Sequence, residues 1–179
     1  MKSINLESTI KDCSFCDLCN LQVNKEHGRM FGFGDNKKRI MIVGINPSIR
    51  RNTNTKYAMF TETVNGTSEG YLKKCINELG YTYEDLYFTN LLKCSTDNND
   101  KPSIDNTNIC VNTYLMQEFA LNMPKKIFCL GSFVYEYLLE QRRFTDYANL
   151  YKVYHHSYIK RSPDKFEEWK TQFLEGLSE

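Results

Sequence analysis

Hydrophobic and polar positions follow two kinds of repeating pattern along the chain. Short apolar runs bounded by turn residues are typical of buried strands, and they cover residues 39–45, 86–90, 126–131 and 151–155. Apolar positions at helical spacing predict helices over residues 68–79, 109–121, 132–140 and 163–177. We expect Ser132 and Ser162 to cap the last two helices, with Pro163 at the first position of the final one.

Strands that alternate with helices predict an α/β fold. In this fold a central, mainly parallel four-stranded sheet forms the middle of three α/β/α layers. The polar stretch over residues 95–108 is expected to be a surface loop that leads into a helix. Because 179 residues suffice for one domain with a substantial core, we expect residues 1–179 to form a single domain.

Composition and charge narrow the class of protein. Hydrophobic residues make up 41% of the chain and charged residues 25%, as in ordinary globular proteins. The sequence contains neither an apolar run of the ~20 residues that a membrane span needs nor the apolar centre of a signal peptide. We therefore expect a cytoplasmic monomer that does not bind membranes. A net charge of +1 excludes nucleic-acid binding by bulk charge, so any contact with DNA must be local.

Four of the seven cysteines are placed as a set of metal ligands. Cys13 and Cys16 form a CxxC pair, and Cys94 and Cys110 lie in a later loop region with fifteen residues between them. Four thiolates suit either tetrahedral zinc or a [4Fe–4S] cluster, and the residues alone leave both open. Cys19 extends the first pair to CxxCxxC. The remaining two, Cys75 and Cys129, fall inside a predicted helix and strand and are expected to be buried and inert.

Polar residues follow several of the predicted strands. In parallel sheets, ligands bind beyond the carboxyl ends of the strands, so these residues are the first candidates for a site. They are Asn46, Pro47, Ser48, Asn90, Gly131, Ser132, His155, His156 and Ser157.

Several segments, in unbroken order, resemble the family 4 uracil-DNA glycosylases, the iron–sulfur class of the uracil-DNA glycosylase superfamily. The matching segments are CSFCDLCNL (13–21), MFGFGDNKKRIMIVGINPS (30–48), LYFTNLLKCS (86–95), MPKKIFCLGS (123–132) and VYHHSYIKRSPDKFEEW (153–169). The resemblance implies a [4Fe–4S] cluster bound by Cys13, Cys16, Cys94 and Cys110, with segment 13–19 contributing to the cluster site. Such a cluster ties down loops near the DNA and takes no part in bond cleavage. Cys19 would either replace Cys16 or be a bystander.

The resemblance also implies where the bond to the base is cleaved. The loop Gly44-Ile45-Asn46-Pro47 would contact the substrate and place the attacking water. The most active members of the superfamily carry Asp at the position of Asn46. Because an amide has negligible basicity, Asn46 could orient water without taking its proton. Family 4 members carry an acidic residue a few positions later, where this chain has Ile49, Arg50 and Arg51. These departures imply a slower enzyme.

Three further side chains would surround the flipped-out base. His155 matches the histidine that donates to uracil O2 as negative charge develops, although His156 replaces the proline that usually follows it. Asn90 matches the amide that reads uracil N3 and O4, because an amide offers a donor and an acceptor side by side. Phe60 is the aromatic residue expected to stack on the base, and core packing is its alternative role.

DNA contacts are expected around the same loops. Ser157, Tyr158 and Ile159 would form a loop that enters the minor groove, where Tyr158 or Ile159 fills the space left by the base. The expected phosphate contacts are Ser48, Arg50, Lys160 and Arg161.

The sequence therefore predicts a base-excision-repair glycosylase. Its substrate would be uracil, or a related damaged or mismatched pyrimidine, in single- or double-stranded DNA, and the protein would associate with the nucleoid. One alternative is a catalytically weak or inactive DNA-binding protein that keeps the fold and the cluster. Another is a cysteine-bound Zn²⁺ protein on an unrelated α/β fold.

Overall fold

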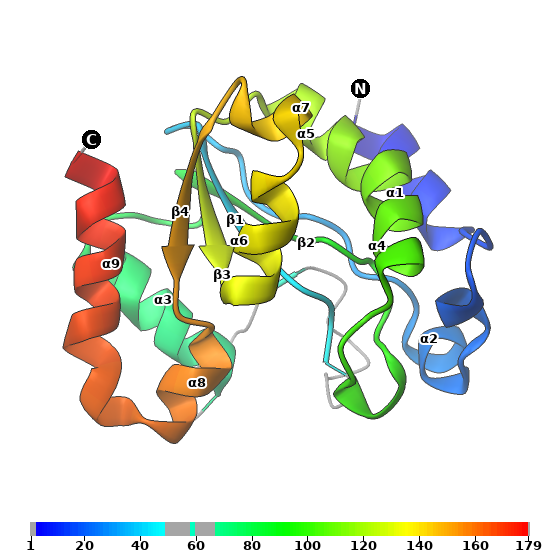
Figure 1. The fold of residues 1–179 in the computed structure, drawn as a ribbon, viewed down its shortest axis with the longest axis horizontal. Helices are drawn as coiled ribbons and strands as arrows, with labels where there is room; N and C mark the ends of the chain where they lie inside the picture. The colour runs from blue at the N-terminus through cyan, green and yellow to red at the C-terminus, as the bar shows by residue number, and fades with distance from the viewer. Residues whose placement is uncertain (1–2, 49–57, 60–66, 179) are drawn as a thin grey trace.

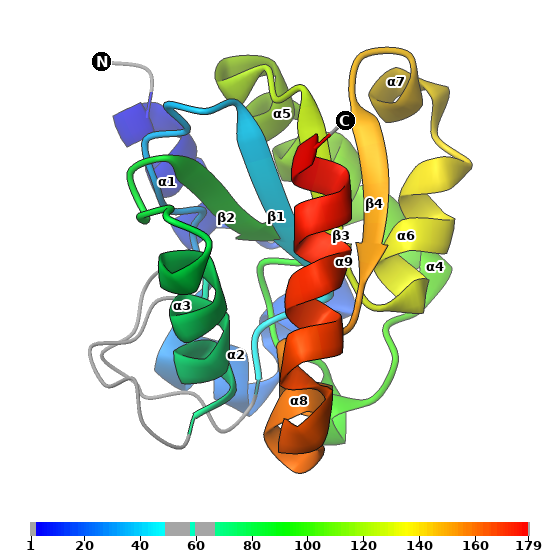
Figure 2. The ribbon, with the colours of Figure 1, turned by 90° about the vertical axis from the view of Figure 1, so that its left-hand side faces the viewer.

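A computed structural model describes residues 3–48, 58–59 and 67–178 of the chain. Four parallel strands form one sheet in the order β2-β1-β3-β4 (Figure 2). The strands are β1 (Ile40–Gly44), β2 (Leu86–Asn90), β3 (Lys126–Leu130) and β4 (Asn149–Val153). The predicted four-stranded parallel sheet is confirmed. Because all four strands run the same way, their carboxyl ends share one edge of the sheet.

Helices cover both faces of the sheet (Figure 1). One face is covered by α1 (Ser3–Lys11), α4 (Ile104–Cys110), a π-helix (Val111–Leu115), α5 (Met116–Asn122), α6 (Ser132–Leu139) and α7 (Arg142–Thr145). The opposite face is covered by α3 (Ser68–Glu78), α8 (His156–Arg161) and α9 (Phe166–Ser178). The helix α2 (Gln22–His27) and single 3-10 turns (Asp17–Asn20, Asp97–Asn99, Pro163–Lys165) complete the described part. None of the helices in these ranges is long and apolar enough to cross a membrane.

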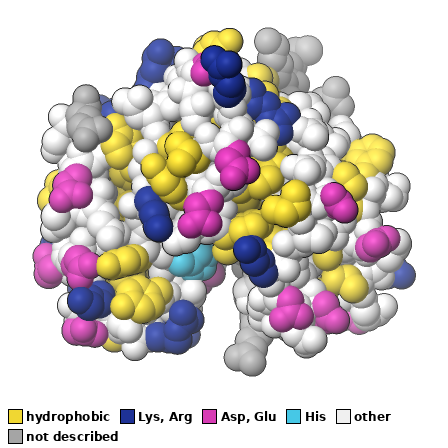
Figure 3. Space-filling model, in the orientation of Figure 1, with side chains coloured by type: hydrophobic (Ala, Val, Ile, Leu, Met, Phe, Trp, Pro, Cys, Tyr) yellow, Lys and Arg dark blue, Asp and Glu magenta, His cyan; other side chains and the backbone are white. Residues whose placement is uncertain are grey.

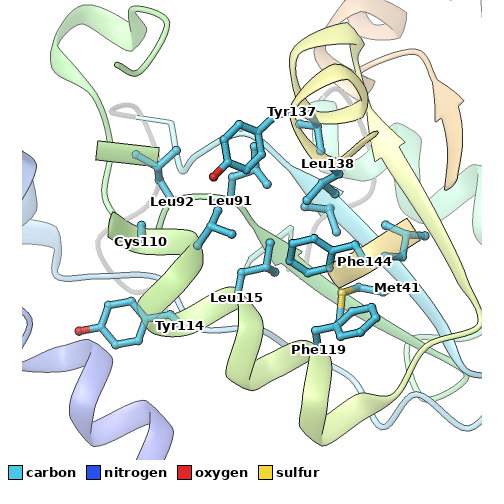
Figure 4. Packing of buried hydrophobic residues seen from close by; sticks show 14 of the residues in the cluster. Met41, Leu91, Leu92, Cys110, Tyr114, Leu115, Phe119, Tyr137, Leu138 and Phe144 are labelled. Carbon is cyan, nitrogen blue, oxygen red and sulfur yellow. The ribbon is translucent and has the colours of Figure 1, made fainter. Parts of the chain in front are cut away.

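β1 is buried and apolar along its whole length because it lies inside the sheet, whereas the edge strand β4 exposes Asn149 and Lys152. Successive residues of β1 alternate between two cores: Met41 packs with α4, α5 and α6, whereas Ile42 packs with α3 and α9. Figure 4 shows the first core, in which Phe119 and Phe144 meet edge to face at 5.0 Å between ring centroids. Cys75 and Cys129 are fully buried in these cores, which confirms their predicted positions.

Two predicted boundaries were wrong by several residues. The helix expected to begin at residue 109 begins at Ile104, where Ser103 accepts a hydrogen bond from the backbone of Asn106. Its first turn is mostly polar, so the spacing of apolar residues does not predict it. The strand expected over 151–155 ends at Val153, because His155 already caps the next helix. His155 therefore lies just beyond the strand and not in it.

Other local expectations also need correction. Ser132 is the first residue of α6, and the residue before it, Gly131, occupies the cap position with φ of 92°. Ser162 precedes the Pro163 turn as expected, but its side chain makes no capping hydrogen bond. Helices α1, α2, α7 and α8 had no counterpart in the sequence-based prediction. They are short, and isolated short helices depend on tertiary packing more than on local sequence.

Candidate active site at the carboxyl edge of the sheet

The carboxyl edge of the sheet gathers the polar residues that follow the strands. Gly44 and Asn90 end β1 and β2 as direct partners in the sheet register. At the other side, the backbone N–H of Gly131 donates to Val153 at 2.8 Å, which places the segment after β4 beside the end of β3. Asn46, Asn90 and His155 thus follow strands that end at one edge. Figure 3 shows a histidine side chain next to a hollow on this side of the molecule.

Gly44 allows Asn90 to lie against the backbone of β1. A Cβ atom at Gly44 would lie 2.5 Å from Asn90 Oδ1 and 2.7 Å from the Met59 side chain. Asn90 is 5% exposed, and no described residue makes a hydrogen bond with its amide. Its donor and acceptor are therefore available to a ligand that offers the complementary acceptor and donor.

The amide of Asn46 is held through its nitrogen. Asn46 Nδ2 donates to the carbonyl of Pro47 at 2.9 Å and lies 3.4 Å from Thr96 Oγ1. Thr96 in turn donates to the carbonyl of Asp100 at 2.6 Å, so the loop that follows β2 supports the loop that follows β1. No described residue donates to Asn46 Oδ1. This oxygen can therefore accept a hydrogen bond from water.

His155 is held in one tautomer by the helix that follows it. As the cap of α8, its Nδ1 accepts from the backbone N–H of Ser157 at 3.2 Å and lies 2.7 Å from Ser157 Oγ. An accepting Nδ1 carries no proton, so the neutral ring carries its proton on Nε2. The capping role thus prepares His155 Nε2 as a hydrogen-bond donor.

Burial keeps the two neighbouring histidines neutral. Desolvation, followed by the nearby His156, lowers the pKa of His155 to about 3. Desolvation alone lowers the pKa of His156 to about 4. The rings stack with centroids 4.2 Å apart, and His156 Nδ1 is buried without a hydrogen-bond partner. At neutral pH the edge therefore presents an uncharged imidazole.

A cavity away from this edge is lined by five cysteines. Three segments meet there: the residues around the 3-10 turn Asp17–Asn20, the turn after β2 and the end of α4. Its cysteines are Cys13, Cys16, Cys19, Cys94 and Cys110. Cys19 Sγ lies 3.6 Å from Cys13 Sγ and 3.9 Å from Cys16 Sγ. All four predicted ligands thus line one cavity, and Cys19 lines it as well. Among the described residues, no group of side chains is arranged around a single metal ion.

The chemistry of this cavity suits a group that binds thiolates. Burial raises the pKa of Cys16 to about 11 and of Cys110 to about 12, so without a metal these thiols stay protonated. Burial also acts on Cys19, but hydrogen bonds from Cys16, Cys13 and Arg29 lower its pKa. Arg29 lines the cavity with a buried Nε that has no partner, and it provides positive charge beside the sulfur atoms. The donor set therefore fits an anionic metal–thiolate centre.

Comparison of the sequence with known protein families identifies the family of this chain. The family model of the uracil DNA glycosylase superfamily matches residues 31–178. The chain belongs to this superfamily.

Two sequence relatives and one solved structure are similar to this chain. The Type-4 uracil-DNA glycosylase of Archaeoglobus fulgidus is 25% identical over 94% of this chain and 90% of its own length. The enzyme of the same name from Pyrobaculum aerophilum is 27% identical over 75% of this chain and 63% of its own length. The crystal structure of Pedobacter heparinus SMUG2 has a TM-score of 0.57 and 14% identity, covering 80% of this chain and 76% of that chain.

One DNA contact expected from the superfamily resemblance was wrong. Ser157, Tyr158 and Ile159 form a helix, α8, and not a loop. Ile159 is 0% exposed and packs in the core with α3 and α9, so it cannot enter DNA. Tyr158 is 36% exposed and keeps the role of the candidate wedge. Ser48, Lys160 and Arg161 are exposed, whereas Arg50 and Phe60 lie outside the described residues.

The superfamily motifs gave no role to two buried charged residues. Lys93 and Glu118 form an ion pair at 2.6 Å with side-chain exposures of 2% and 1%. Lys93 directly precedes Cys94 in an otherwise apolar run, and a lysine in such a run is a recognisable departure from core composition. Arg29 was also missed. No motif includes it, so nothing in the sequence marks it as a residue that lines a cavity.

Proposed function

We propose that this chain is a DNA glycosylase that hydrolyses the N-glycosidic bond of uracil, or of a related damaged or mismatched pyrimidine, in DNA. The observation that carries the proposal is His155, a neutral imidazole whose Nδ1 is occupied by Ser157. Its Nε2 therefore carries the proton and can donate to a ligand at the edge where Asn46 and Asn90 also lie. Relatives that are named Type-4 uracil-DNA glycosylases support the same reaction.

Each of the three residues has a task in the proposed reaction. The base leaves the DNA stack, and Asn90 binds its edge, donating to O4 and accepting from N3–H. As the bond between C1′ and N1 breaks, its electron pair moves onto the base, and His155 Nε2–H donates to the O2 that gains charge. Asn46 Oδ1 accepts from the water that then bonds to C1′. Because an amide cannot take the water's proton, this proton leaves to solvent after the base has departed.

Ser48, Lys160 and Arg161 are exposed beside this edge and are suited to contact the DNA backbone. We assign phosphate contacts to Ser48, Arg50, Lys160 and Arg161, and base stacking to Phe60. Tyr158 would fill the space in the duplex from which the base is removed. With a net charge of +1, attraction to DNA depends on these local contacts.

The cysteine cavity would hold a [4Fe–4S] cluster through Cys13, Cys16, Cys94 and Cys110. When bound, the cluster links three chain segments and so acts as a structural crosslink. Arg29 would offset the negative charge of the thiolates. Iron and sulfide content of the purified protein, with its visible absorption, tests this assignment, and a stoichiometric Zn²⁺ content without iron would replace it.

The decisive test of the reaction is the release of uracil. The protein is incubated with single-stranded and duplex oligonucleotides that contain one uracil, and abasic sites are detected by alkaline cleavage. We expect cleavage that is reduced in His155→Ala and Asn46→Ala and retained in His27→Ala, a matched histidine variant on α2. Tight binding of uracil DNA without abasic sites would instead support a binding protein that retains the fold.

A further inference from the structure

A buried lysine lies directly behind the end of β2. Lys93 is 1% exposed, although lysine is rarely buried in proteins. Its Nζ donates to Thr89 Oγ1 at 2.6 Å, to Glu118 Oε2 at 2.6 Å and to the carbonyl of Asn90 at 3.1 Å. All three donor positions of the ammonium group are thus used. Two of them hold the last two residues of β2, and the third crosses to α5.

Stability alone does not account for this arrangement. Removing two charges from water is costly, and replacing a buried ion pair with neutral groups is often harmless to stability. The pair is also incompletely satisfied, because Glu118 Oε1 is buried without a hydrogen-bond partner. Thr89 Oγ1 lies 2.6 Å from Glu118 Oε2, so the carboxylate and the ammonium both contact the same strand residue. The Lys93 ammonium group is costly to bury, yet three hydrogen bonds hold it at the end of β2. This arrangement indicates that the group serves to position the residues it contacts.

Lys93 also faces the cysteine cavity. Its backbone N–H lies 3.3 Å from Cys110 Sγ, and the next residue is Cys94. One residue therefore joins the wall of the cavity to the backbone of Asn90. The side chain of Asn90 lies against Gly44, where a displacement of the β2 end would move the amide away from its place on β1.

We propose that Lys93, together with Glu118, is a positioning residue for base recognition: it ties the backbone of Asn90 to the cysteine cavity and so fixes the amide that reads the pyrimidine. This inference rests on the proposed function of the site. The ion pair itself touches no substrate. Its effect is on the choice of base, because hydrogen bonds to a base edge depend on accurate placement of the amide.

The test compares base preference in two variants of the full chain. Lys93→Met/Glu118→Gln removes both charges, so neither is left buried alone. Lys126→Met is the matched control: Lys126 Nζ also donates to backbone carbonyls, those of Gly176 at 2.9 Å and Leu177 at 3.0 Å, but at the opposite edge of the sheet. Fluorescence anisotropy measures binding to oligonucleotides that carry either 2′-fluoro-2′-deoxyuridine or 2′-fluoro-2′-deoxycytidine, both uncleavable, at the same position. Cytosine has a donor at N4 and an acceptor at N3, the reverse of uracil, so a correctly placed amide favours uracil. Iron content and thermal unfolding are recorded for each protein.

We expect the parent chain and Lys126→Met to prefer the uracil analogue, and the double variant to lose about 10-fold or more of that preference. The double variant should do so while it remains folded and keeps its iron content. A double variant that retains the full preference overturns the role of Lys93. A parent chain without any preference for the uracil analogue overturns the proposed function itself, and with it this inference.

Discussion

The two ends of the carboxyl edge bury polar side chains in opposite ways. At the β2 end, Lys93 and Glu118 form a buried ion pair with 2.6 Å between Nζ and Oε2. At the β4 end, His155 and His156 stack at 4.2 Å and lose their charge, because burial lowers the pKa of both rings. The first end keeps an attractive force between elements, and the second keeps an uncharged hydrogen-bond donor.

This difference matches the tasks assigned to the two ends. Reading a base edge requires a fixed amide, and a charge-assisted contact holds position well because it is short and strong. Stabilising charge on a departing base requires a donor at its O2, and a neutral imidazole with its proton on Nε2 provides one without burying a charge. The two ends should therefore respond differently to mutation and to pH.

The largest effect is expected from breaking the ion pair at the β2 end. Lys93→Met leaves the Glu118 carboxylate buried without its counter-charge, which should cost about 3–5 kcal/mol of unfolding free energy. Lys93→Met/Glu118→Gln should recover most of this loss because neither charge then remains. Urea unfolding of both variants provides the measurement. A single variant no less stable than the double variant would contradict a buried, charged pair.

The next effect concerns the donor at the β4 end. His155→Ala should lower kcat for uracil release by roughly 10²–10³-fold, as the loss of one donor to a developing negative charge does in other enzymes. KM should change little, because the donor acts on charge that is absent from the ground state. Single-turnover kinetics on a uracil oligonucleotide separates the two quantities. An equal loss through KM alone would argue that His155 only binds the base.

A smaller effect, but a distinctive one, is expected from pH. The folded pKa values of His155 and His156, about 3 and about 4, lie below the value of 6.5 for free histidine. The unfolded chain therefore takes up protons first as the pH falls below 6.5, and folding stability declines from there toward pH 4. His156→Phe keeps a stacked ring without titration. It should abolish on the order of 2 kcal/mol of this acid-induced loss, measured by urea unfolding at pH 7 and pH 4.5.

Charged neighbours of His155 shift its pKa less than burial does. Glu69 on α3 raises the pKa of His155, and Arg161 on α8 lowers it, but desolvation is the largest influence. For the same reason, His155 stays neutral from pH 5 to pH 8, so uracil release should show no titration of this group in that range. A rate that falls with an apparent pKa near 6.5 would contradict the buried, neutral ring.

The comparison also shows what the sequence could predict. The strand pattern and the motifs around Asn46, Asn90 and His155 were sufficient for the sheet and for the common edge, because strand order and direction place these residues there. The ion pair could not be predicted from the sequence, because Lys93 and Glu118 are 25 residues apart and only the packing of α5 on β2 brings them together. Ile159 was misplaced for a related reason, since burial of α8 against α3 and α9 depends on tertiary contacts that a motif does not contain.

Removing one hydroxyl group at each end gives the finest test of the contrast. Thr89 Oγ1 donates to a buried carboxylate at 2.6 Å, and a hydrogen bond to a charged group contributes about 1.5–3 kcal/mol, so Thr89→Val should cost that much. Ser157 Oγ lies 2.7 Å from Nδ1 of the neutral His155 ring. The same Nδ1 also accepts a hydrogen bond from the backbone N–H of Ser157. Ser157→Ala keeps that backbone contact and should cost about 1 kcal/mol or less. Equal losses in urea unfolding would contradict the contrast between a charge-assisted hydrogen bond at the β2 end and a neutral one at the β4 end.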